Sequence, residues 1–134
     1  MSGLNWKAVL VGIVVDFVGT LAVGFVAAVI AIATGPGLDG PPPQFDEPPV
    51  LAALLVVGLA LTSFGAFIAA RMAGVEHIKH GLAVGVAMLL LGFLLIPFGG
   101  MPLWYDVLSI LLIVPAGWVG GYLAAGMARA PARS

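Results

Sequence analysis

Charged residues divide the chain into four long stretches that contain no Asp, Glu, Lys or Arg. These stretches cover residues 17–38, 48–70, 81–105 and 107–128. A helix crosses the hydrocarbon layer of a membrane with about 20 mainly apolar residues, each adding about 1.5 Å of rise. Each stretch is long enough for one crossing, and apolar residues before Asp16 extend the first. The pattern predicts four transmembrane helices.

Proline and glycine set the ends of these helices, because neither residue continues a lipid-exposed helix well. A Gly-Pro-Gly run ends the first helix, Pro97 ends the third, and Pro102 suits the first turn of the fourth. Residues 34–49 include six prolines and are expected to form a stiff loop outside the membrane. The predicted spans are 5–33, 50–73, 79–97 and 103–128.

Two parts of the chain resemble each other. Residues 65–73 match residues 120–128 at an offset of 55, and residues 21–24 recur as 82–85 at an offset of 61. The longer first external loop accounts for the difference between the offsets. We predict an all-α polytopic membrane protein, a single domain over 1–134, with four transmembrane helices as two similar hairpins. Internal duplication and chance similarity between apolar segments both explain the match.

The basic residues indicate one orientation in the membrane. With the N-terminus inside, all five flank the cytoplasmic ends of the spans and none lies in an external loop. Lys and Arg in short loops stay on the cytoplasmic side, so both termini are predicted to be cytoplasmic, in a prokaryotic plasma (inner) membrane. These residues are Lys7, Arg71, Lys79, Arg129 and Arg133.

Composition excludes several classes of protein. Hydrophobic residues make up 62% of the chain and charged residues 8%, whereas soluble domains carry about 25% charged residues. The net charge of −1 gives no basic surface for nucleic acid, and the absence of cysteine excludes disulfides and thiolate metal sites. No phosphate loop, serine triad or pair of catalytic carboxylates is present. We therefore predict that the protein is not an enzyme and that it binds no cofactor or metal. Its predicted partner is the lipid bilayer that surrounds it.

Asp16 lies well inside the first predicted span. A carboxylate at mid-membrane costs about 2.5–3.5 kcal/mol on insertion scales, so it normally faces protein or water and has a partner. One interpretation is a proton or cation site. The other is a structural carboxylate bonded to Thr20 or to a neighbouring helix. Asp16 corresponds to His77 at the offset of 61, which places it in the inner half of the membrane.

The predicted cytoplasmic turn carries Glu76, His77 and His80. Residues three or four apart share one face of a helix, but two histidines and one acid give few ligands for a metal ion. Side chains solvated near the lipid headgroups are the simpler interpretation. We also hypothesise that Asp16 pairs with one of the two histidines at the inner surface.

Small residues mark the faces on which the helices are expected to pack. Helices associate in lipid where glycine lets their backbones approach, and Gly81 with Gly85, and Gly117 with Gly121, have the favourable four-residue spacing. These faces serve either packing inside the bundle or contact with another subunit. Pro115 removes a backbone hydrogen bond and predicts a kink in the fourth span.

A further pattern runs along nearly the whole chain. It consists of Asn5-Trp6-Lys7, Gly12, Asp16, Gly19-Thr20, Glu76, Lys79-His80-Gly81, Trp104-Tyr105 and residues 120–124. This pattern resembles that of small four-span prokaryotic membrane proteins of the uncharacterised YrzE-like kind. The resemblance implies an architecture without an activity.

The first span is also similar, over residues 16–20, to that of small multidrug-resistance exporters, in which a membrane glutamate followed by Gly-Thr binds drugs and protons. Here Asp16 replaces the glutamate, and the aromatic lining of the second and third spans has no counterpart.

Two functions follow from these features. The first is a non-catalytic accessory subunit that packs against other membrane subunits or against copies of itself, because small residues are abundant and no reactive group of residues is present. The second is a small transporter or an ion or proton channel that uses Asp16. A cavity that reaches Asp16 would favour the second.

Overall fold

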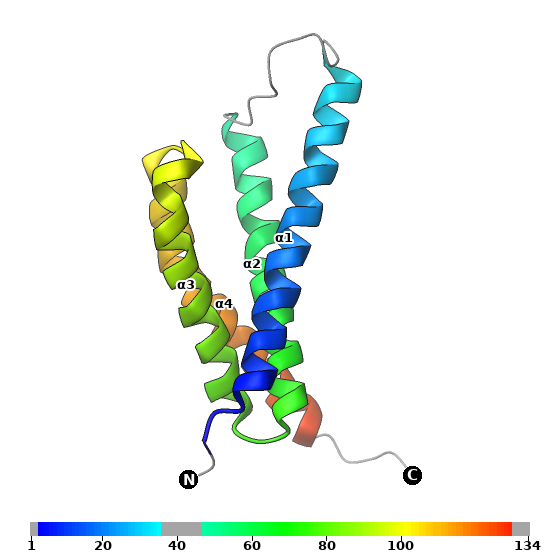
Figure 1. The fold of residues 1–134 in the computed structure, drawn as a ribbon, viewed down its shortest axis with the longest axis vertical. Helices are drawn as coiled ribbons and strands as arrows, with labels where there is room; N and C mark the ends of the chain where they lie inside the picture. Colours follow the sequence, from blue (N-terminus) through cyan, green and yellow to red (C-terminus); the bar gives the residue numbers. More distant parts are fainter. Residues whose placement is uncertain (1–2, 36–46, 130–134) are drawn as a thin grey trace.

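The computed structural model describes residues 3–35 and 47–129, with residues 96–99 described by their backbone alone. These ranges form four α-helices, which Figure 1 shows in chain order. All four are long and apolar enough to cross a membrane, the third over His77–Leu95, so the predicted all-α fold is confirmed. The helices are α1 (Trp6–Thr34), α2 (Pro48–Ala73), α3 (His77–Gly99) and α4 (Leu103–Arg129).

Each helix begins and ends within two residues of its predicted span. The Asn5 side chain caps α1 by accepting a hydrogen bond from the Ala8 amide, and α2 begins at Pro48, where a missing amide proton costs nothing. Helix α3 does not end at Pro97 as expected. It continues to Gly99 and ends at Gly100, whose φ of 59° only glycine adopts easily. Most of the predicted external loop lies outside the described residues.

Successive helices run in opposite directions, so the first residue of α1 and the last of α4 lie at the same end of the bundle (Figure 1). We call this end, with Trp6, Ala73, His77 and Arg129, the terminal end. The opposite end, with Thr34, Pro48, Gly99 and Leu103, is the loop end.

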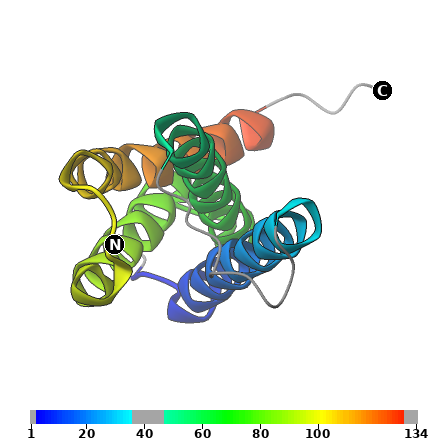
Figure 2. The same ribbon diagram turned by 90° about the horizontal axis from the view of Figure 1, so that it is seen from above.

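Helix α2 contacts each of the other three helices, and α4 packs against α2 and α3. Within the described ranges, α1 and α4 make no contact, and the view from above shows them on opposite sides of α2 and α3 (Figure 2). The apolar core gathers in the half of the bundle nearer the terminal end, where Val9, Ala66, Ala69 and Val84 pack together. Towards the loop end α1 leans away from α3 and α4 (Figure 1).

Glycine backbones form the tightest contacts in that terminal half. A methyl group on Gly12 would lie 2.6 Å from the carbonyl oxygen of Gly65, and one on Gly117 would lie 2.6 Å from that of Gly81. Gly120 of α4 approaches the Ser63 carbonyl of α2 even more closely. Since helices in lipid gain little from hiding apolar side chains from one another, this backbone proximity holds the bundle together.

Candidate functional site

A cleft of about 400 Å³ lies between the helices and is lined by residues from all four. Its volume falls in the range of small-molecule sites, about 300–1,000 Å³. Half of the 18 described residues that line it are leucine, isoleucine or methionine. Its polar residues form two groups, which we call the deep group (Asp16, Thr20 and Thr62) and the outer group (Tyr105, Asp106 and Ser109).

The carboxylate of Asp16 is fully buried at the base of the cleft. Its Oδ1 atom accepts a hydrogen bond from the Thr20 hydroxyl at 3.4 Å, which is long for a bond between two oxygens. Its Oδ2 atom is also buried and makes no hydrogen bond of good geometry within the described part of the chain, although the Thr62 hydroxyl lies close enough to interact with the carboxylate. Asp16 is therefore a buried and only weakly hydrogen-bonded carboxylate, which is expensive to maintain.

Glycine packing between α1 and α2 places this carboxylate. Gly12 and Asp16 lie one turn apart on the same face of α1, and Gly12 brings that face against Gly65 of α2. A methyl group on Gly65 would stand 3.1 Å from the Asp16 Cβ, so glycine at this position also makes room for the acidic side chain. Thr62, one turn before Ala66 on α2, lies at the same depth and donates its hydroxyl proton to the Gly58 carbonyl at 3.2 Å.

The outer group belongs to the first turns of α4. Asp106 lies in the first turn, where the helix dipole favours a negative charge. The Ser109 hydroxyl donates to the Tyr105 carbonyl at 2.8 Å, and the Trp104 ring meets the Tyr105 ring edge-on at 6.0 Å. Asp106 therefore lines the cleft near its loop end, in addition to favouring the start of its helix.

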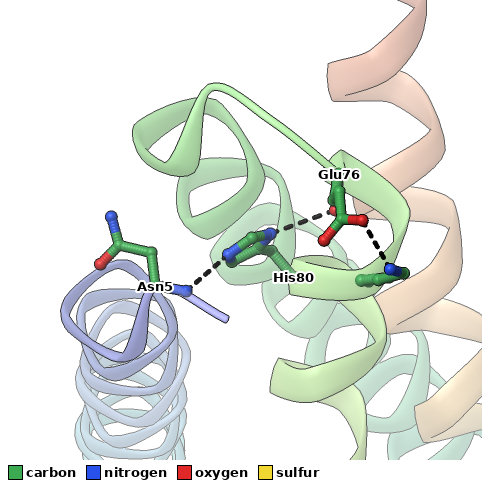
Figure 3. Close-up of polar contacts among 4 residues, drawn as sticks. Asn5, Glu76 and His80 are labelled. Carbon is green, nitrogen blue, oxygen red and sulfur yellow. Dashed lines mark hydrogen bonds and ion pairs between the residues drawn. The ribbon is translucent and has the colours of Figure 1, made fainter. Parts of the chain in front are cut away.

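A second polar arrangement joins α1 to α3 at the terminal end (Figure 3). The backbone amide of Asn5 donates to Nε2 of His80 at 2.9 Å, and Nδ1 of His80 lies 3.1 Å from the Glu76 carbonyl oxygen. Because Nε2 accepts, the imidazole proton belongs on Nδ1, which donates to Glu76. His80 is fully buried, while the ion pair between Glu76 and Lys79, at 2.5 Å, is exposed on the lysine side.

The hypothesis that Asp16 pairs with a histidine is wrong. His80 uses both ring nitrogens on Asn5 and Glu76, whereas the Asp16 carboxylate accepts its hydrogen bond from Thr20. Asp16 follows Asn5 by 11 residues, which is about 16 Å along a helix, so Asp16 is much deeper in the bundle. His77 lies one turn before His80, still nearer the terminal end. In 3–35 and 47–129, no three His, Asp or Glu residues gather as metal ligands.

The glycines that the sequence singles out, Gly81, Gly85, Gly117 and Gly121, all lie in the contact between α3 and α4. Gly12, Gly65 and Gly120 approach neighbouring helices equally closely. None of these three glycines has another glycine four residues away on its own helix. Only the fold therefore shows which helices meet at these positions.

Comparisons with protein-family models, with curated proteins and with solved structures found no match. The resemblance to YrzE-like membrane proteins therefore stays a prediction from the sequence.

Proposed function

We propose that this protein is a small, non-catalytic integral membrane protein that binds a cation at Asp16 and moves it across the membrane, as a transporter or channel. The observation that carries the proposal is the cleft that reaches a buried and only weakly hydrogen-bonded carboxylate. An ionisable side chain inside the membrane lowers the stability of the protein, and such residues commonly mark ion or proton routes.

The surroundings of Asp16 favour a proton or a monovalent cation with an apolar body. A hard divalent cation such as Ca²⁺ takes 6–8 oxygen ligands, while the deep group offers one carboxylate and two hydroxyls. The apolar walls of the cleft suit a ligand that shares its carbon surface with them and places its charge against the carboxylate.

The proposed location is a prokaryotic plasma membrane with the terminal end in the cytoplasm, so that the outer group of the cleft lies nearer the outside. Four of the basic residues, Lys7, Arg71, Lys79 and Arg129, belong to the helix turns nearest the terminal end, which supports this orientation. The chain has no cysteine, so single cysteines test it cleanly. A membrane-impermeant maleimide should label Gln44→Cys in intact cells and Ser134→Cys only after permeabilisation; the reverse pattern would contradict it.

Transport is tested in proteoliposomes with two probes, protons reported by an internal pH dye and radiolabelled tetraethylammonium, whose permanent charge prevents leakage as a neutral base. We expect wild-type protein to carry at least one probe and Asp16→Asn to lose that uptake. Glu47→Gln is the matched control, because Glu47 is an exposed acid before α2 and does not line the cleft. Unchanged uptake of both probes by Asp16→Asn would remove the proposal.

The second candidate is a packing subunit of a membrane assembly or homo-oligomer. It is favoured by the loop-end half of α1, where a methyl group on Gly24 would meet no neighbour within 4 Å and large apolar residues such as Leu21 and Phe25 are exposed. Under this candidate Gly24→Leu disrupts assembly. Gentle purification followed by mass measurement decides, since a strictly monomeric wild-type protein without partners would count against it.

A further inference from the structure

The two groups of polar residues in the cleft lie at different depths. Asp16, Thr20 and Thr62 are at its base, whereas Asp106 belongs to the first turn of α4 at the loop end. The α4 wall runs between these depths from Asp106 to Ile113, seven residues or about 10 Å of helix. The intervening surface is apolar, with residues such as Leu59, Leu91 and Ile110.

Two carboxylates in one cleft have different surroundings. Asp106 is half-buried near the loop end, whereas Asp16 is fully buried and only weakly hydrogen-bonded. An outer, partly hydrated carboxylate attracts a cation without holding it tightly, and a dry carboxylate farther in binds it more strongly. The apolar surface between the two carboxylates offers no further binding site for the cation.

We infer that Asp106 is an outer binding residue that captures cations at the loop end of the cleft and passes them to Asp16. The inference rests on the proposed function, because it assigns the side of the bundle from which a cation reaches Asp16. It adds a second residue with a separate role. Asp106 sets how efficiently cations are captured, while Asp16 is required for them to cross.

The first experiment measures tetraethylammonium uptake against its concentration, in vesicles oriented so that a C-terminal tag is inside. We expect Asp106→Asn to raise the half-saturating concentration roughly five- to tenfold with a nearly unchanged maximal rate, as loss of a rim charge slows capture. Asp106→Glu should behave as wild type, and so should Glu47→Gln, which removes a loop-end charge outside the cleft. The effect of Asp106→Asn should shrink at high salt, because about 1 M salt shortens the screening length to about 3 Å.

The second experiment measures binding without transport. Trp104 adjoins Tyr105 and Asp106, so its fluorescence reports on the outer group once Trp6 and Trp118 are replaced by phenylalanine. Tetraethylammonium should change the Trp104 emission in this background. Asp106→Asn should abolish that change, and Asp16→Asn should retain it.

The outcomes separate the inference from the proposed function. If Asp106→Asn matches Glu47→Gln in uptake and in Trp104 emission, the inference fails while transport through Asp16 stands. If Asp106→Asn instead abolishes the maximal rate as Asp16→Asn does, Asp106 acts in the crossing itself and the inference is overturned. If Asp16→Asn retains full uptake, the proposed function fails, and a Trp104 signal lost only in Asp106→Asn still supports an outer cation site.

Discussion

At the scale of single residues, burial and hydrogen bonding distinguish the two ionisable side chains that the bundle encloses. His80 is buried with both ring nitrogens occupied, so its polarity is satisfied by the fold. Asp16 is equally buried but only weakly hydrogen-bonded. Satisfied buried groups stabilise a structure, whereas unsatisfied ones destabilise it and are retained for another reason.

Replacing the carboxylate with a side chain of similar shape tests this distinction. We expect Asp16→Leu to raise the free energy of unfolding by about 1–3 kcal/mol, because it removes a desolvated polar group and adds apolar contacts. Uptake should be lost in the same variant, as stability gained at a functional position commonly costs activity. Denaturant titration in detergent provides the measurement. A clear loss of stability would instead support the structural interpretation, in which the hydrogen bond between Asp16 and Thr20 stabilises the bundle.

His80 is expected to behave in the opposite way. His80→Phe keeps a ring in place but leaves the Asn5 amide without its acceptor, at a cost of about 1 kcal/mol or somewhat more. The Glu76 carbonyl keeps the backbone amides of Lys79 and residue 80 as its donors. Hydrogen exchange at the Asn5 amide should accelerate. His77→Phe, one turn earlier on α3, is the matched control and should change neither quantity. Equal effects of the two variants would mean that His80 does not join α1 to α3.

At the scale of helices, glycine determines which pairs approach closely. The seam between α3 and α4 leaves no space for a methyl group at Gly81 or Gly117, while Gly126 on the same α4 faces open space. The Ser63 hydroxyl adds a hydrogen bond of 2.9 Å to the Ala116 carbonyl, which joins α2 to α4 just after Pro115. Helix α4 therefore packs on both sides, and α1 is the least covered helix.

Two alanine variants on α4 separate packing from helix propensity. Gly117→Ala should destabilise the bundle by about 1–3 kcal/mol, because the new methyl group collides with the backbone of α3, which cannot yield without moving the helix. Gly126→Ala meets no neighbour and should be neutral or stabilising by up to about 1 kcal/mol. The two variants are compared by their unfolding midpoints in detergent. Similar midpoints would show that α3 and α4 can move apart without loss of stability.

At the scale of the whole molecule, tight packing in the terminal half and separation of the helices at the loop end produce one cleft. Residues of all four helices line the cleft, and glycines in its wall keep it wide. Gly92 lines the cleft and has no neighbour within 4 Å of a methyl position. The loop-end half of the bundle thus has room for a ligand. The tightly packed terminal half leaves no such space between Asp16 and the terminal end.

Filling the cleft should block transport without unfolding the protein. We expect Gly92→Leu to lower tetraethylammonium uptake by at least about tenfold, which corresponds to a steric penalty of only about 1.4 kcal/mol. Gly24→Leu places the same side chain in open space on α1, outside the cleft, and should transport normally if it remains folded. Circular dichroism and thermal unfolding confirm folding, and equal uptake by both variants would contradict a ligand in this cleft.

The four helices, nearly all of their ends and the unusual position of Asp16 can be read from the amino-acid order alone. These features are local, because the length of an apolar stretch and the glycine or proline at its end decide whether a segment crosses the membrane. Three other features became visible only in the folded chain. His80 binds Asn5 instead of Asp16, Asp106 shares a cleft with Asp16, and α1 and α4 make no contact within the described residues. The reason is physical: lipid solvates apolar side chains as well as another helix does, so apolar patterning alone does not select partners. The fit of backbone against backbone selects them, and that fit depends on residues far apart in the chain.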